Sequence, residues 1–319
     1  MALSGIAGRP ARQRGAGFGP LQLLGRVSET RWWAYLLLLP SLILILAIIF
    51  YPVAEGFILS FREMKLNRPA LGTGFVGFRH YIDLWHDEVF WIAVRNTVVY
   101  VGVSVVLELA LGLIVALALV RGPPGSGLMG VLILVPWFLP NVVAGNIWAL
   151  MLDPRLGVIN DILVKVGILG SYKAWFADPL TALPAAIAVE VWHGFPFFAL
   201  LLIAALKGIP KELLEAAGID GASRPRTFWS VTLPLLRPII VATVLLRVIS
   251  LFNSPDLLLI LTGGGPGYAT RVLSLHAFET AYRNFDFGYA AAISVVMFLA
   301  LAVFYYTYLR ASQGMRRVD

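Results

Sequence analysis

Hydrophobic residues gather into six long stretches, each with the length of a membrane-spanning helix. A helix that crosses a bilayer needs roughly 20 apolar residues, and the last stretch has no charged residue from Gly288 to Leu309. Prolines in the early stretches suit membrane helices that bend against their neighbours. The pattern predicts an all-α polytopic membrane protein with six transmembrane helices, at about 32–59, 91–120, 128–152, 180–206, 235–261 and 288–309.

The polar segments between these stretches predict the orientation of the chain. Six spans put both termini on one side, and that side holds 14 Lys or Arg residues against nine on the other. Because positively charged loops favour the cytoplasmic side, we expect cytoplasmic N and C termini. The domain organisation that follows is a flexible tail at 1–31, a six-helix domain at 32–311 and a second cytoplasmic tail at 312–319.

Composition supports a membrane protein and excludes several other classes. The chain is 59% hydrophobic and 13% charged, whereas a soluble domain carries about a quarter charged residues. Its basic residues lie in short loops beside apolar segments, so we expect no nucleic-acid partner. The absence of cysteine excludes disulfides and thiolate metal sites. His80, His86 and His276 have no partners at metal-ligand spacing, so we expect no metal site and place these histidines at solvated or interfacial positions.

The loop at about 207–234, between the fourth and fifth spans, has the most informative pattern. Pro210 suits the first position of a helix and Gly218 its end, and Asp220 can cap a second helix. These residues predict a short helix and turn on the cytoplasmic side. Such an element can fit a groove on a partner or can be an ordinary interfacial helix, and the residue pattern alone leaves both readings open.

Glu215-Ala216-Ala217, followed after two residues by Asp220-Gly221-Ala222, resembles the EAA loop of binding-protein-dependent ABC importer permeases. The resemblance implies the type I ABC importer fold. It also implies that the loop docks its helix into a cleft on an ATP-hydrolysing subunit, so that ATP binding moves the membrane helices. The coupling residues it implies are Glu215, Ala216, Ala217, Gly218, Asp220, Gly221 and Ala222.

The likeness extends over roughly 32–311. Asn96-Thr97, the run Leu-Thr-Gly-Gly-Gly-Pro at 261–266 and Asp286-Phe-Gly at 286–288 resemble the carbohydrate-uptake branch, which includes the maltose and glycerol-3-phosphate permeases. The maltose-type permease has two additional spans and a large outer domain, and we expect neither here. The resemblance is therefore to the six-span, glycerol-phosphate-like form, and it does not imply maltose as the solute.

Ionisable and polar residues inside the fourth and fifth spans predict a substrate path. Such groups are costly in a bilayer and face a cavity or a partner. Helical spacing puts one set on one face of each span, near the middle of the membrane. The set on the fourth span is Glu190, His193, Gly194 and Phe197, and the set on the fifth is Arg247, Ser250, Leu251 and Ser254.

The resemblance points to the same faces. The segment 192–197 is similar to the stretch that lines the sugar site of the maltose permease, which implies sugar contacts for His193, Gly194 and Phe197. The fifth span departs from that permease at Ser250, Leu251 and Ser254, so we expect a different ligand or pose. Arg247 can meet an anionic group such as phosphate. Equally, Glu190 and Arg247 can pair to hold two helices together.

The glycine-rich segment after the fifth span, with Gly264, Gly265 and Pro266, predicts an outer turn for docking or gating. No G-x-x-x-x-G-K-[ST] motif and no nucleophile–base set occur in the sequence. We therefore expect a non-catalytic subunit that binds no cofactor, with ATP and Mg²⁺ held by partner ATPase subunits.

The expected protein is a multi-pass permease of the inner or plasma membrane that translocates a sugar or sugar-like solute by alternating access. Its expected partners are a second permease in a heterodimer, two ATPase subunits and an extracytoplasmic solute-binding protein. The alternative is an ion-coupled secondary transporter with Glu190 and Asp256 as ion sites. A membrane-embedded enzyme has no supporting residue cluster.

Overall fold

The computed structural model describes residues 31–68 and 74–314, and these are mostly helical. Within them the only β-type pairings are two isolated bridges, Arg62 with Phe75 and Lys65 with Asp286. The predicted tails at 1–31 and 312–319 lie almost entirely outside the described residues. The chain divides into two compact units, residues 1–55 and 56–319.

The first unit holds most of the first span. α2 (Arg31–Ile45), a π-helical turn η1 (Leu46–Phe50) and α3 (Tyr51–Leu59) run without a break. Every side chain from Tyr35 to Glu55 is exposed, and the segment from Tyr35 to Leu59 is long and apolar enough to cross a bilayer. An apolar helix of this kind needs lipid or another protein around it, so the first predicted span is confirmed.

Four long helices form the frame of the second unit: α5 (Glu88–Val120), α9 (Pro179–Lys207), α12 (Leu233–Asn253) and α15 (Phe287–Gly314). α5 and α9 pack along each other and supply much of the buried core, including Tyr100, Val105, Phe198 and Leu202. A Cβ on Gly112 would lie only 2.6 Å from the Cβ of Phe198. A small residue at this point lets the two backbones approach closely, as in other membrane-helix pairs.

The third predicted span is not one continuous helix. α6 (Ser126–Phe138) and α7 (Asn141–Met151) meet at an angle of 96° across Leu139 and Pro140. Pro140 has no N–H to continue the helix, and the residue before a proline favours extended backbone. Leu139 is extended, with φ −72° and ψ 134°. The described helices therefore include five that can cross a membrane, or six if this bent pair is counted as one span.

The fifth predicted span is shorter than the apolar stretch suggests. α12 ends at Asn253, and α13 (Asp256–Leu261) is a separate short helix. Proline at position 255 lies between them and accounts for the interruption, because it removes a backbone donor. The prediction of one helix over 235–261 is wrong in this respect.

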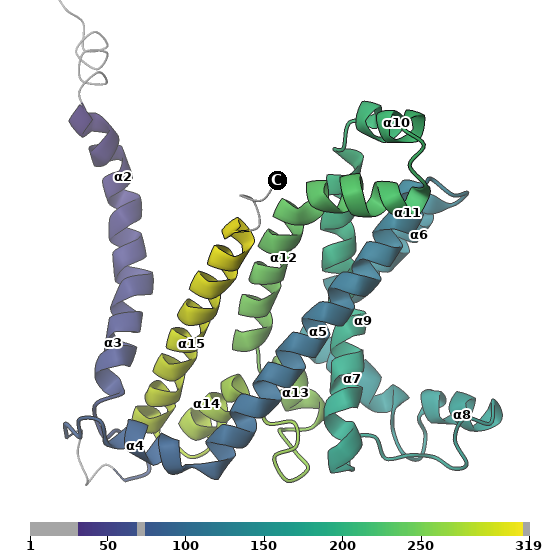
Figure 1. Cartoon of the computed structure of the whole chain (residues 1–319). Coiled ribbons are helices and arrows are strands. Elements are labelled where there is room, and N and C mark those ends of the chain that lie inside the picture. The colour runs from purple at the N-terminus through teal and green to yellow at the C-terminus, as the bar shows by residue number, and fades with distance from the viewer. Residues whose placement is uncertain (1–30, 69–73, 315–319) are drawn as a thin grey trace, which may run out of the picture. The chain divides into compact units, whose positions relative to one another are not determined.

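The connections of the second unit gather at two opposite ends (Figure 1). α4 (Arg79–His86), α8 (Val158–Lys165) and α14 (Leu273–Tyr282) lie at one end, which we call the α14 end. α10 (Lys211–Ile219) and α11 (Arg224–Thr227) lie at the other, the α10 end, as does the last part of α15. The loops that the charge pattern predicts to be outside thus share one end, and the predicted coupling loop lies at the other.

Candidate functional site

A buried cluster of charged side chains joins three of the long helices. The guanidinium of Arg247, on α12, lies between Glu108 of α5 and Glu190 of α9. Its Nε and Nη2 donate to the two carboxylate oxygens of Glu108 at 2.6 and 2.8 Å, and Nη2 also donates to Oε1 of Glu190 at 2.5 Å. The hydroxyl of Tyr100 donates to the other oxygen of Glu190 at 2.8 Å. We call Tyr100, Glu108, Glu190 and Arg247 the Arg247 cluster.

Burial makes these contacts strong. The exposed fractions are 0% for Glu108, 5% for Glu190 and 8% for Arg247. An ionised group in such a place is stable only with a partner, and here every carboxylate oxygen accepts a hydrogen bond. The pairing of Glu190 with Arg247 that the sequence left open is therefore present. The second carboxylate, Glu108, was missed, although its place in the middle of a predicted span was a readable signal.

Gly194 makes room for this cluster. A Cβ on Gly194 would collide with Nη2 of Arg247 and with Oε1 of Glu108. Only a residue without a side chain lets α9 pass this close to the guanidinium and the carboxylate. The family resemblance predicts that Gly194 contacts sugar, and the close packing of the three helices gives a separate reason for a glycine at this position.

His193 connects α9 to the bend in the third span. Its Nε2 donates to the carbonyl oxygen of Leu139 at 3.0 Å, which supplies a partner for a backbone group beside the interrupted helix. One turn along α9, the ring of half-buried Phe197 lies 5.9 Å from that of Trp137, near the end of α6. These two predicted path residues therefore line the inner side of the α6–α7 bend.

The predicted residues on the fifth span differ in exposure. Leu251 is buried in the main core, Ser254 is half-buried and Ser250 is exposed. The hydroxyl of Ser254 donates to Asp256 at 3.2 Å, at the exposed start of α13. The structure thus brings Glu190, Gly194 and Arg247 together, places His193 and Phe197 against the α6–α7 bend, and contact with a solute remains a prediction for all eight residues.

The predicted coupling residues form α10 and the turn that ends it. The N–H of Gly221 donates to the carbonyl of Gly218 at 3.1 Å, and the N–H of Ala222 donates to that of Ala217 at 2.9 Å. Gly221 has φ +75°. This pair of bonds with a left-handed residue is a Schellman motif, in which glycine is strongly favoured. The Asp-Gly-Ala part of the motif is therefore the end of the helix.

Three details of the predicted loop are wrong. Pro210 immediately precedes α10, which begins at Lys211, and the helix continues past Gly218 to Ile219. Asp220 ends α10 and does not cap the next helix, which Ser223 precedes. No residue of α10 is buried within the described chain, and Leu213, Leu214 and Ile219 are all exposed. The α10 end thus presents a short helix with uncovered apolar side chains.

The predicted outer turn is held from α5 by Asn96 and Thr97. Nδ2 of Asn96 donates to the carbonyls of Tyr268 and Arg271 at 2.9 and 3.0 Å, and Oγ1 of Thr97 accepts the N–H of Leu273 at 2.8 Å. Gly264 has φ +84° and an added Cβ would lie 3.3 Å from Leu275. The two polar residues at the start of the second span therefore fix the glycine-rich turn against the α14 end.

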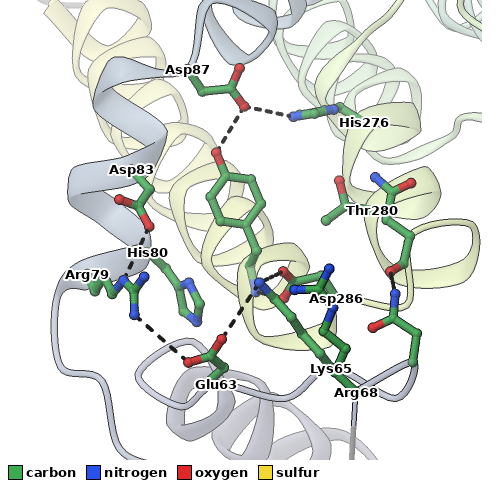
Figure 2. Close-up of a pocket in the computed structure, with 13 residues that line it drawn as sticks. Glu63, Lys65, Arg68, Arg79, His80, Asp83, Asp87, His276, Thr280 and Asp286 are labelled. Atoms are coloured by element: carbon green, nitrogen blue, oxygen red, sulfur yellow. Dashed lines mark hydrogen bonds and ion pairs between the residues drawn. The ribbon is translucent and has the colours of Figure 1, made fainter. Parts of the chain in front are cut away.

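A polar cavity of about 470 Å³ opens at the α14 end (Figure 2). Carboxylates and basic groups alternate around it, with Lys65 3.1 Å from Asp286 and Arg79 3.9 Å from Asp83. Among the described residues, no group of three or more His, Asp or Glu side chains is placed to hold a metal ion. The lining is Glu63, Lys65, Asn67, Arg68, Arg79, His80, Asp83, Asp87, His276, Thr280, Asn284, Asp286 and Tyr289.

Two of the histidines expected at solvated or interfacial positions are instead buried beside this cavity. His80 contacts the carbonyl of Arg62 at 3.1 Å, and Nε2 of His276 lies 3.7 Å from Asp87. Burial lowers the pKa of His276, with the Asp87 carboxylate opposing and the Arg271 guanidinium reinforcing that shift. The packing of α4 against α15 and of α14 against both α5 and α15 buries these rings, which local sequence does not reveal. His86 is exposed, as predicted.

Comparison with known proteins identifies the family. Residues 108–317 match the model of the "Binding-protein-dependent transport system inner membrane component". The chain is 38% identical over 282 residues to the trehalose/maltose transport system permease protein MalF of Thermococcus litoralis, covering 88% of this chain and 94% of that protein. It is 37% identical over 294 residues to the sulfoquinovosyl glycerol transport system permease protein SmoG of Agrobacterium fabrum, with the same coverage.

A solved structure shows the same fold. A bacterial ABC transporter involved in the import of the acidic polysaccharide alginate aligns with a TM-score of 0.77 at 22% identity, over 92% of this chain and 98% of that one. Together with the sugar permeases above, this confirms the resemblance to the carbohydrate-uptake branch and the multi-pass membrane location. The chain belongs to the binding-protein-dependent transport system inner membrane components, the permease subunits of ABC importers.

Proposed function

We propose that the chain forms half of the translocation path of an ATP-driven importer for a sugar or sugar-like solute, with α10 as the helix on which an ATPase subunit docks. The observation that carries this proposal is α10 itself: an uncovered helix, closed by Gly221, at the end opposite the predicted outer loops. The proposal makes the α10 end cytoplasmic, in agreement with the charge pattern. Relatives named for trehalose and diacetylchitobiose transport support a sugar-like solute.

A continuous helix connects the α10 end to the middle of the membrane. α11, the π-helical turn η3 (Phe228–Thr232) and α12 form one helical run from Arg224 to Asn253, and α10 contacts both α11 and η3. Arg247 lies on this run. A displacement of α10 by an ATPase subunit would therefore act directly on the helix that carries Arg247, which is the physical basis for coupling ATP binding to alternating access.

The remaining partners complete this scheme. A second permease, in a heterodimer, would cover the exposed faces and supply the other half of the path. A solute-binding protein would dock at the α14 end, and one solved relative is a complex with a periplasmic protein. ATP and Mg²⁺ would be held by two ATPase subunits, so that this chain performs no chemistry and binds no cofactor.

Co-expression with the ATPase subunit, followed by pulldown and uptake assays, tests the proposal. Glu215→Lys and Gly221→Asp should abolish ATPase association and solute uptake, since they alter the proposed docking helix and its end. Glu212→Lys is the matched control: it makes the same charge change on an exposed residue of the same helix, outside the motif. Wild-type association and uptake in both motif variants would rule out α10 as the coupling helix.

A further inference from the structure

The Arg247 cluster has two carboxylates around one guanidinium. From this we infer that the permease passes neutral carbohydrates and discriminates against anionic ones. The inference rests on the proposed function, because it concerns the solute of the same path. An arginine near the middle of a transport path can bind an anionic solute, such as a phosphorylated or uronic sugar, or it can hold helices together. The two carboxylates give Arg247 the second role.

The two carboxylates already occupy three of the five N–H groups of the guanidinium, the one on Nε and the two on Nη2, at 2.5 to 2.8 Å. The N–H groups on Nη1 share a positive charge that these carboxylates already offset. An anion that took Nε or Nη2 would displace Glu108 or Glu190 and leave that carboxylate buried without its partner. Such a buried, unpaired charge is strongly unfavourable. The exchange would replace an intramolecular, bidentate contact with an intermolecular one, so binding of an anionic solute to Arg247 is unfavourable.

The net charge of the cluster also disfavours an anionic solute. With both carboxylates ionised, the cluster carries one net negative charge, and with one proton bound it is neutral. In neither state is it positive. The cluster adjoins the predicted path, since Gly194 lies against both Arg247 and Glu108 and shares a face of α9 with His193 and Phe197.

The other basic groups of the described spans lie away from the cluster along their helices. Within residues 56–314, α6 and α7 contain no charged residue at all. The side chain of His193 already donates to the carbonyl of Leu139. Three of the other basic residues of these helices lie toward the ends of their spans: Arg95, Lys207 and Arg310. Arg237 lies about 15 Å along α12 from Arg247, on the side of the α10 end.

The size of the expected discrimination follows from Coulomb's law. One net negative charge about 8 Å from a singly charged solute, at an effective dielectric constant of about 20, changes its occupancy of the path by about 30-fold. Family membership does not decide the matter, because one relative is named for trehalose and maltose and the solved structure belongs to a transporter of an acidic polysaccharide.

The test uses the complete importer, with its second permease, ATPase subunits and solute-binding protein, in proteoliposomes with ATP at the ATPase side. The probes are trehalose and maltose against trehalose 6-phosphate and maltobionate, at concentrations that saturate the binding protein, with uptake divided by the measured occupancy of that protein. We expect the neutral sugars to be taken up about 30-fold faster than the singly charged maltobionate, and the difference to be larger for trehalose 6-phosphate, whose phosphate carries more than one charge near pH 7. A binding protein that accepts only neutral sugars also supports the inference.

Two variants assign the effect to the cluster. Glu108→Gln and Glu190→Gln each remove one negative charge with little change in shape, and each should reduce the neutral-to-anionic ratio by about tenfold or more. A ratio is independent of the amount of folded protein, so partial misfolding does not disguise the result. Asp161→Asn, which changes a half-exposed carboxylate of α8 that pairs with Lys165 at the α14 end, should leave the ratio unaltered.

The outcomes separate this inference from the proposed function. Equal or faster uptake of the anionic sugars by wild type, a binding protein that accepts only anionic sugars, or an unchanged ratio in both Gln variants would overturn the inference while leaving an ATP-driven sugar importer intact. No uptake of any probe, together with no stimulation of the ATPase by loaded binding protein, would overturn the proposed function itself.

Discussion

Replacement of Gly194 by alanine is the sharpest test of how the three core helices are joined. The added Cβ would collide with Nη2 of Arg247 and Oε1 of Glu108. Both atoms belong to buried side chains that are fixed by each other, so neither can swing into solvent to relieve the overlap. Either the guanidinium leaves Glu108 or α9 moves away from α12, and both changes break the Arg247 cluster.

The expected magnitude combines two opposing terms. Breaking a buried ion pair costs about 3–5 kcal/mol of stability. Alanine in place of glycine inside a helix returns about 1 kcal/mol. We therefore expect Gly194→Ala to lower the free energy of unfolding by about 2–4 kcal/mol. Gly102→Ala is the matched control, since Gly102 also lies inside a long membrane helix and an added Cβ there meets no atom within 4 Å.

The measurement is reversible unfolding of the purified permease complex in mixed micelles, followed by helical content as the fraction of denaturing detergent rises. Gly102→Ala should be as stable as wild type or slightly more stable, and Gly194→Ala should unfold at a clearly lower denaturant fraction. Equal stability of the two variants would refute the reasoning, because it would mean that α9 does not pass against the Arg247–Glu108 pair.

Three further predictions concern the two ends of the molecule. Gly221→Val should weaken ATPase pulldown and destabilise α10 by about 1 kcal/mol or more, because a β-branched residue is strained at φ +75°. Gly218→Ala, with open space around it, should leave the stability of α10 unchanged. Asn96→Leu removes two hydrogen bonds to the outer turn and should lower the stability of that turn by about 2 kcal/mol, which would appear as faster proteolysis near residues 263–271. The control Asn67→Leu removes only the exposed bond from Asn67 to Asn284 and should leave the rate of proteolysis unchanged. Since burial lowers the pKa of His276 from 6.5, the unfolded chain binds more protons, and stability should fall as the pH drops below about 6.5; His276→Gln should flatten that part of the stability profile.

The apolar pattern was sufficient for the number and approximate limits of the spans, because bilayer thickness fixes the length of an apolar helix. It was insufficient at positions 140 and 255. Proline is tolerated inside many membrane helices, so the sequence does not say which proline bends a helix and which interrupts it. Beside Pro140, the carbonyl of Leu139 accepts its hydrogen bond from His193, 54 positions away in the sequence, so this partner is not visible in the local sequence.

The candidate site was only partly predictable for a different reason. Helical spacing relates residues three or four apart, and it placed Glu190 with His193 and Gly194 correctly on one face. Residues 108 and 247, however, are 139 positions apart, and their meeting depends on how α5, α9 and α12 pack. Glu108 lies in the second span, so helical spacing within the fourth and fifth spans could not reveal it or the negative charge that it adds to the cluster.

The position of the Arg247 cluster also limits how the proposed transport cycle can work. α12 receives any displacement from α10 through one continuous helical run, and the cluster attaches α12 to both α5 and α9 by charge-assisted hydrogen bonds. Because breaking such a buried pair costs about 3–5 kcal/mol, these three helices should move together as one body in every turnover. Alternating access would then arise at other places: the interface with the proposed second permease, and the α6–α7 bend. That bend interrupts the third span, and it is joined to α9 by the packing of α6 along α9 and by the bond from His193 to Leu139, which is worth about 1 kcal/mol. A change of angle at this bend would act directly beside His193 and Phe197, two of the residues predicted to contact the solute.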